Sequence, residues 1–271
     1  MSHPFHGDGA RTLYTSEDRT RQRSEALLSA KTSGRNISEV ICGFADSVRL
    51  PERPSILDVG CGQGRTTVRL ARHYPDASLT AVDASPAMVA ATVKRTAGLN
   101  VEALTGDFHS LPFGDSSFDL AIAIMCLYHS PTPHLAISEI GRTLRASAIL
   151  VTKAIDSYSE LAALLEVTGL DPRATSRPSL YEAAHSGNLP ELTEQGGLQV
   201  DQVEHETHTF TFNDLMHTAT YLATCPQFVL PDHVRQPQIL AAELRSRIPD
   251  GPITTSATIT YVLARPTGRT P

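Results

Sequence analysis

A buried strand that breaks into a glycine-rich loop is the feature that most constrains this chain. Residues 56–59 form an apolar run, and Gly60, Gly62 and Gly64 follow it in a G-x-G-x-G spacing. Residues without a β-carbon let the backbone turn sharply and approach a bound ligand closely. Because a helical pattern begins directly after these glycines, we expect a ligand at this strand-to-helix junction.

The spacing of the glycines separates this loop from two common nucleotide-binding loops. The dinucleotide fingerprint requires its third glycine at the position that Arg65 occupies here. A phosphate-binding loop requires Gly-Lys-Ser/Thr, which does not follow. The pattern therefore argues against a nicotinamide, flavin or nucleoside triphosphate site.

Apolar runs alternate with helical stretches through the first half of the chain, and this alternation predicts a parallel sheet. We expect an α/β fold with a doubly wound, mostly parallel seven-stranded sheet. Its predicted strands are residues 55–59, 78–82, 101–104, 118–124, 148–154, 203–212 and 254–262. The last two lie about forty residues apart, which suggests an antiparallel finish to the sheet.

The chain is expected to form one domain with three parts. Residues 1–50 carry two amphipathic helices and form an N-terminal helical cover. Residues 51–155 form the ligand-binding core. Residues 156–271 complete the same domain with a helical lid insertion at about 213–250 and the final strands.

Two further motifs stand where the second and third strands end. Asp83 follows the second strand, 23 residues beyond Gly60, where a carboxylate can accept hydrogen bonds from ribose hydroxyls. Gly106, Asp107 and Phe108 close the third strand. Because the carboxyl ends of parallel strands line one crevice, these motifs should converge with the glycine loop on one ribose-containing cofactor.

The three motifs, in this order, resemble the class I methyltransferases of the ubiquinone/menaquinone-biosynthesis type, over roughly Ser55 to Ala154. The resemblance implies a Rossmann-like fold that binds S-adenosyl-L-methionine. It places the methionine part on the glycine loop, the ribose on Asp83 and the adenine on Asp107 and Phe108. The cofactor-binding residues it implies are Asp58, Gly60, Cys61, Gly62, Gly64, Asp83, Ala84, Met88, Gly106, Asp107, Phe108 and Met125. Asp58 has an alternative role in orienting the loop.

The segment after the fourth strand is the expected position of catalytic groups. Methyl transfer needs alignment of the reacting atoms and, for some acceptors, removal of a proton. His129 suits a general base at neutral pH, with Tyr128 beside it. The alternative is that this Tyr-His pair only shapes the pocket.

Substrate-binding residues are expected on the covers. Arg19 and Arg23 lie four residues apart on the first helix, where they can grip an anionic substrate or simply face solvent. Tyr14 precedes them. His217 and Tyr221 share one face of the lid, where they either line the substrate pocket or pack.

Composition limits the partners. The net charge of −6 argues against nucleic acid, and no run of about 20 apolar residues suggests a membrane span. The four cysteines are widely separated and follow no leader-like segment, so we expect a cytoplasmic protein with reduced thiols. The sequence lacks an acidic pair of the kind that coordinates magnesium, so we expect no metal site.

The sequence departs from the family where the fifth strand begins. Leu144-Arg145-Ala146-Ser147-Ala148 replaces the family's Leu-Lys/Arg-Pro-Gly-Gly turn, so the turn must differ or carry strain. We expect methyl transfer to a small molecule in secondary (natural-product) metabolism, with a homodimer or a partner subunit both open. Two alternatives remain: a fold repurposed for elimination or intramolecular cyclisation, and a non-catalytic partner subunit.

Overall fold

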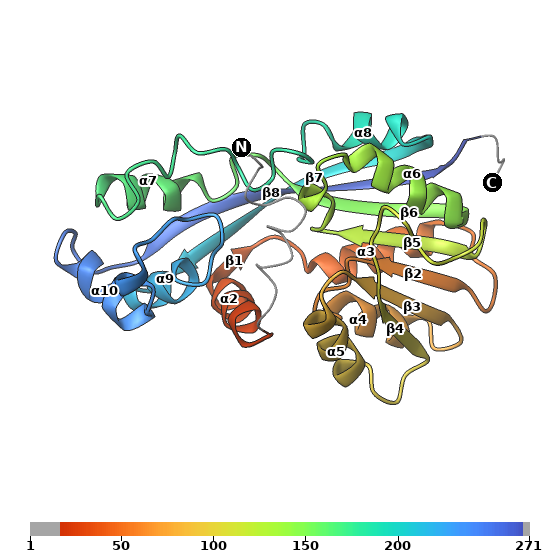
Figure 1. Ribbon diagram of the computed structural model, residues 1–271, viewed down its shortest axis with the longest axis horizontal. Coiled ribbons are helices and arrows are strands. Elements are labelled where there is room, and N and C mark those ends of the chain that lie inside the picture. The colour runs from red at the N-terminus through yellow and green to blue at the C-terminus, as the bar shows by residue number, and fades with distance from the viewer. Residues whose placement is uncertain (1–16, 268–271) are drawn as a thin grey trace.

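A mixed sheet of eight strands runs through residues 17–267, the part of the chain that the computed structural model describes (Figure 1). The strand order is β1-β7-β8-β6-β5-β2-β3-β4. The strands are β1 (Lys31–Ser33), β2 (Ser55–Val59), β3 (Ser78–Asp83), β4 (Val101–Thr105), β5 (Phe118–Ile124), β6 (Leu144–Lys153), β7 (Leu198–Phe212) and β8 (Ile253–Pro266). Strands β2 to β6 pair with one another in parallel, whereas β8 is antiparallel to β6 and β7, and β1 is antiparallel to β7.

Helices cover both faces of this sheet, with α3, α4 and α5 in mutual contact on one side and α6 and α8 on the other. The N-terminal and core helices are α2 (Glu17–Ala30), α3 (Ile37–Ser47), α4 (Arg65–His73), α5 (Pro86–Arg95), the 3₁₀ turn η1 (Leu127–His129) and α6 (Pro133–Thr143). The later ones are α7 (Ser159–Val167), α8 (Leu189–Gln195), α9 (Leu215–Leu222), the 3₁₀ turn η2 (Asp232–Val234) and α10 (Pro237–Arg245). None of these helices is long and apolar enough to cross a bilayer.

Burial explains why the central strands read as continuous apolar runs. Six of the seven residues of β5 are buried, because helices pack on both of its faces. By contrast, β7 alternates buried and more exposed residues only in its last third. Helix α5 begins as expected, with the hydroxyl of Ser85 accepting the Met88 N–H and Pro86 at the first helical position.

The predicted architecture is confirmed, with corrections at its margins. The sheet has an eighth strand, β1, whose three residues pair with β7. The lid predicted at about 213–250 contains α9, η2 and α10, and the late strands are antiparallel as expected.

The altered turn between α6 and β6 contains no residue in the left-handed conformation. Helix α6 ends at Thr143 and β6 starts at Leu144, whose φ of −90° and ψ of 142° are already extended. A register irregularity between Phe118 and Leu120 absorbs the change in pairing. Arg145 Nε donates to Asp119 Oδ1 over 2.8 Å, and Asp119 Oδ2 also accepts the Ser55 N–H. An ion pair therefore stabilises the edge where the family has glycines.

Strands β7 and β8 continue as a two-stranded arm beyond β6. The pairing of β6 with β8 stops at Lys153↔Ile259, whereas β7 and β8 stay paired as far as Phe212↔Ile253. Figure 1 shows α9 and α10 at the far end of this arm, with α2 beside them. The arm thus holds the lid beside the carboxyl edge of the parallel strands.

Candidate functional site

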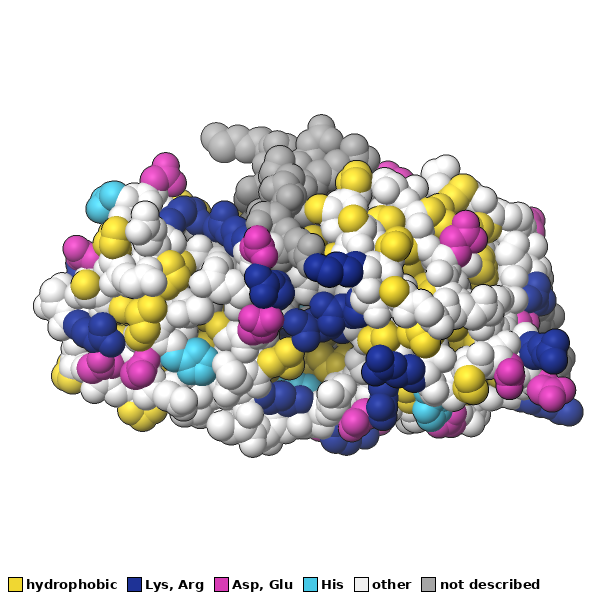
Figure 2. All heavy atoms as spheres, turned by 90° about the horizontal axis from the view of Figure 1, so that it is seen from below, with side chains coloured by type: hydrophobic (Ala, Val, Ile, Leu, Met, Phe, Trp, Pro, Cys, Tyr) yellow, Lys and Arg dark blue, Asp and Glu magenta, His cyan; other side chains and the backbone are white. Residues whose placement is uncertain are grey.

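A cavity of about 500 Å³ lies at the carboxyl edge of the parallel strands, a size typical of ligand pockets. Residues from β2, β3, β5 and β6 line it, and α2 and the α9–η2 segment contribute its cover. Figure 2 views the molecule from the side of α2 and α5 and shows Lys and Arg side chains gathered in the middle of that face. The predicted convergence of strand ends on one site is therefore present.

The glycine loop approaches its neighbours so closely that a side chain does not fit at Gly60. Its φ is 68°, and a β-carbon there would lie 2.5 Å from Cys126 Cβ. The N–H groups of Gly60 and Cys61 both donate to Val82 O, which ties the loop to the end of β3. Gly60, Cys61 and Gly62 line the cavity. Gly64 does not; it begins α4 at a φ of 69° and packs on Thr92.

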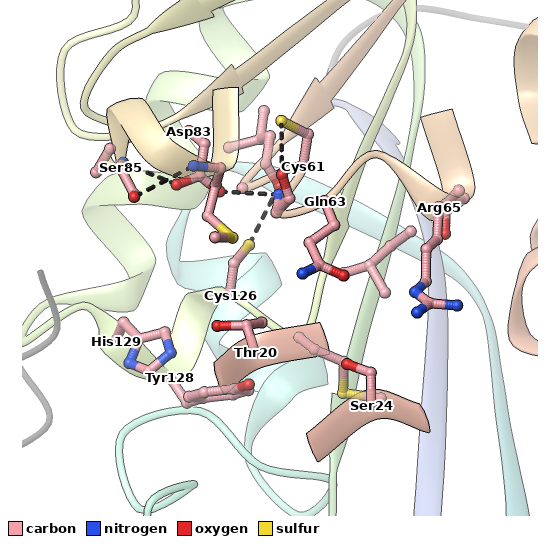
Figure 3. Close-up of a pocket in the computed structure, with 18 of the residues that line it drawn as sticks. Thr20, Ser24, Cys61, Gln63, Arg65, Asp83, Ser85, Cys126, Tyr128 and His129 are labelled. Atoms are coloured by element: carbon pink, nitrogen blue, oxygen red, sulfur yellow. Dashed lines mark hydrogen bonds between the residues drawn. The ribbon is translucent and has the colours of Figure 1, made fainter. Parts of the chain in front are cut away.

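Asp83 is fixed at the cavity wall by two backbone donors. Its Oδ2 accepts the Gly62 N–H at 2.9 Å, and its Oδ1 accepts the Ser85 N–H at 2.8 Å (Figure 3). Burial raises the pKa of the carboxyl, and these two hydrogen bonds oppose the rise. Each oxygen keeps a second lone pair, so the carboxylate can accept two hydroxyl groups of a ligand.

Asp58 lines the cavity from beneath the loop, where it is almost fully buried. Thr67 Oγ1 donates to its Oδ2 over 2.5 Å, and its side chain is almost inaccessible to solvent. Burial raises its pKa to about 7, partly offset by the Thr67 hydrogen bond, and the nearby Asp83 adds to the rise. These contacts favour the alternative role, in which Asp58 orients the loop.

The loop after β4 contains a histidine, His109, that the sequence analysis did not identify as a site residue. Asp107 Oδ1 accepts the His109 N–H at 2.9 Å and lies 3.0 Å from its Nδ1, while His109 Nε2 lies 2.8 Å from Ser130 Oγ. Gly106, Asp107, Phe108 and His109 all line the cavity. His109 thereby links the predicted adenine-binding loop to the end of η1.

The segment after β5 turns abruptly into the cavity. Met125 has a φ of 54°, a conformation that non-glycine residues rarely adopt outside functional sites. Cys126 Sγ donates to Val59 O, and Tyr128 and His129 follow on η1 (Figure 3). Both side chains line the cavity with their ring centroids 4.5 Å apart, as expected for groups near the reaction.

Two of the predicted substrate-binding residues form hydrogen bonds between α2 and the α9 segment instead of lining the cavity. Arg19 Nη2 donates to Ala223 O, and His217 Nε2 lies 2.9 Å from Ala26 O; neither residue lines the cavity. Tyr221 does line it. Tyr14 falls outside the residues that the structure describes.

Several further lining residues carry no motif. From α2, Thr20 and Ser24 face Gln63 and the ring of Tyr128 (Figure 3). Lys153, at the carboxyl end of β6, also lines the cavity, together with residues of later loops such as Tyr181 and Pro226. In the sequence, only its position near the end of a predicted strand could have indicated that Lys153 belongs to the site. The remaining cofactor-side residues Ala84 and Met88 line the cavity as predicted.

The geometry fits the cofactor that the motifs imply. A loop that excludes a β-carbon, a carboxylate held with free lone pairs at the neighbouring strand end, and a third strand end converge on one cavity. Residues 56–147 match the family model of a methyltransferase domain. This chain contains a class I S-adenosylmethionine-dependent methyltransferase domain. The match covers the strands that build the cofactor side of the cavity.

Known proteins share this methyltransferase domain and its fold. Over 129 residues the chain is 35% identical to a malonyl-acyl-carrier-protein O-methyltransferase of Herminiimonas arsenicoxydans, covering 45% of this chain and 48% of that relative. The chain thus spans about half of that relative's length. A suspected methyltransferase from Bacillus halodurans has a TM-score of 0.58 at 16% identity, over 84% of this chain and all of that one. The cyclase SpnF has a TM-score of 0.53 at 21% identity, over 84% and 81%.

Proposed function

We propose that this chain transfers a methyl group from S-adenosylmethionine to a small molecule held between the sheet edge and the lid. The observation that carries the proposal is Asp83, whose carboxylate is aligned by the N–H groups of Gly62 and Ser85 beside a loop too tight for a side chain. Such an acid at the second strand end suits a ribose diol.

The division of roles follows from the cavity walls. The glycine loop would hold the methionine part, Asp83 the ribose, and Asp107 and Phe108 the adenine. When bound, the cofactor supplies a methyl group on a sulfonium, which is already an activated leaving group. The protein's remaining tasks are to exclude water, orient the acceptor and accept a proton where the acceptor has one to lose.

We assign proton removal to His129, with Tyr128 positioning the acceptor. Both lie on η1, directly after the strained Met125, and both line the cavity. His129 is partly exposed, so a proton it accepts can leave to solvent.

On the acceptor side, Tyr221 contributes to the pocket wall, whereas Arg19 and His217 act through the cover; Tyr14 stays a predicted substrate-binding residue. In the structure Arg19 and His217 join α2 to α9, so their effect on substrate comes from closing the pocket. We place the reaction in secondary (natural-product) metabolism.

Calorimetry with S-adenosylhomocysteine tests the cofactor assignment. Wild type, D83A and D83N are titrated, with D76A on the exposed α4–β3 turn as a control. We expect D83A to lose at least 100-fold in affinity, since it removes two hydrogen bonds to a charged group, each worth about 1.5–3 kcal/mol. D83N keeps an acceptor oxygen and should lose less.

Wild-type protein that binds neither S-adenosylhomocysteine nor S-adenosylmethionine would refute the proposal. Binding combined with acceptor turnover that leaves S-adenosylmethionine unconsumed would point instead to the repurposed fold, whose chemistry would be elimination or cyclisation.

A further inference from the structure

We propose that the acceptor is an organic acid with an apolar body, and that Lys153 pairs with its carboxylate inside the cavity. This inference rests on the proposed function, because it assigns the acceptor half of the same cavity. It concerns a residue that the cofactor motifs do not include.

Lys153 stands at the end of β6 with few protein partners. Its Nζ donates to Tyr158 Oη over 2.9 Å and lies 4.8 Å from the ring centre of Tyr158 and 5.6 Å from that of Tyr181. An ammonium has three donors, and this arrangement uses one in a hydrogen bond. Within residues 17–267, no carboxylate lies within ion-pair distance of Lys153.

The charges around the cavity are divided between its two ends. The acids that line it, Asp58, Asp83 and Asp107, belong to the cofactor strands. The charged group that acts most on Lys153 apart from Cys225 is Arg23, also a lining residue and also a cation. The two charged side chains placed at the acceptor end, Lys153 and Arg23, are therefore both cations.

A lysine in this place is costly unless a ligand uses its charge. Burial lowers the pKa of Lys153 to about 8; the Cys225 thiol opposes this change, and Arg23 adds to it. The other titratable groups around it are the hydroxyls of Tyr158 and Tyr181 and the imidazole of His208, whose pKa Lys153 helps to lower. A methionine would fill the same space without the desolvation penalty. The retained ammonium at a cavity wall indicates an anionic ligand.

The walls beside Lys153 define the rest of the acceptor. They are the rings and aliphatic groups of Tyr128, Leu180, Tyr181, Tyr221 and Pro226. The rings of Tyr128 and Tyr181 meet edge to face at 5.0 Å, so this apolar wall is continuous from η1 to Lys153. An acceptor with its carboxylate on Lys153 therefore extends its apolar body toward His129.

A single ammonium suits a singly charged carboxylate better than a dianionic phosphate, for which proteins usually supply several donors. The same chemistry nevertheless admits both, so the test includes each. The alternative is a purely structural role, in which Lys153 only stabilises Tyr158, a residue with a strained backbone at a φ of 67°. Y158F, which removes the hydroxyl, separates that role from anion binding.

The test measures binding to protein saturated with S-adenosylhomocysteine. Phenylacetate, hydrocinnamate and octanoate are each compared with the corresponding amide, and phenyl phosphate serves as the phosphate arm. Proteins are wild type, K153M, K153R, Y158F and K94M, the last altering an exposed lysine of α5. Thermal shift and calorimetry give the affinities.

We expect wild type, K94M and Y158F to bind at least one acid 10-fold or more tighter than its amide, and K153M to lose that preference while K153R keeps it. Equal affinity for all acid and amide pairs, an unchanged preference in K153M, or tighter binding of phenyl phosphate than of every acid would overturn the assignment. Affinity for S-adenosylhomocysteine is measured first on each protein. Its loss in wild type refutes the proposed function, whereas its retention with no acid preference refutes only this inference.

Discussion

Replacing Gly60 by alanine tests the tight packing of the glycine loop against the end of β5. The new β-carbon would lie 2.5 Å from Cys126 Cβ and 2.8 Å from its Sγ, in a backbone at φ 68°. The left-handed conformation costs an alanine about 1–2 kcal/mol. Overpacking of this kind adds about 1–3 kcal/mol. We therefore expect G60A to lower the free energy of unfolding by about 2–5 kcal/mol.

The matched control is G62A, two residues away in the same loop. Its φ is 55°, but no atom lies within 4 Å of the added β-carbon, so only the conformational cost applies. Urea unfolding should give a difference of about 1–3 kcal/mol between the two variants, the contribution of the contact alone. In calorimetry, G60A should also bind S-adenosylhomocysteine at least 10-fold more weakly than wild type, because the loop must shift. If G60A matched G62A in stability and wild type in affinity, the argument from close approach would be wrong.

Four further predictions follow from the same structure. R145A should lower the free energy of unfolding by about 0.5–1 kcal/mol at pH 7, because Arg145 is partly exposed and solvent screens the pair. Burial works against the charge on Asp119, but the Arg145 hydrogen bonds and the Ser55 N–H outweigh it and lower its pKa. That stabilisation is present above the unfolded pKa and is lost as pH falls through the lowered one, so urea titrations of R145A and wild type should converge once the pH is below that lowered pKa. D58N should be more stable than wild type by up to about 4 kcal/mol at pH 8 and equally stable at pH 4. The reason is that burial raises the pKa of Asp58 to about 7, so the carboxyl ionises at lower pH in the unfolded chain than in the folded protein. A stability difference that stayed constant from pH 4 to pH 8 would contradict this cause. Affinity for a carboxylate probe should fall above about pH 8 as Lys153 loses its proton, and K153R should keep its affinity to pH 9. H129A should lower kcat by about 100-fold with unchanged S-adenosylhomocysteine affinity; a change confined to KM would assign His129 to pocket shape.

The sequence predicted which strand ends meet at the cavity because the signals for them are local. A glycine loop after a buried strand and an acid at the next strand end specify backbone geometry within a few residues, and the structure brings Gly60 and Asp83 to one cavity. The convergence of the strands then follows from parallel topology. Gly64 departs from this pattern, because its left-handed backbone serves the start of α4 rather than the ligand.

The acceptor side could not be predicted in the same way because its contacts join distant segments. Arg19 and His217 share helix faces with residues that line the cavity, but their side chains bond across the α2–α9 contact, 204 and 191 residues away in sequence. Strand β1 has three residues, too few for any periodicity to appear. Lys153 reads as an ordinary lysine at a strand end until Tyr158 and Tyr181 are placed around it.

The arm formed by β7 and β8 separates the requirements on the two halves of the cavity. Because its hydrogen bonds continue past Lys153 without help from β6, the arm can lengthen, bend or exchange its helices while the glycine loop and Asp83 stay in register. Selection for a new acceptor can therefore act on the part of the cavity wall that residues 198–266 contribute, such as Tyr221 and Pro226, without disturbing the cofactor side. Chimeras that exchange this segment between related chains should keep nucleoside binding and change only what is modified.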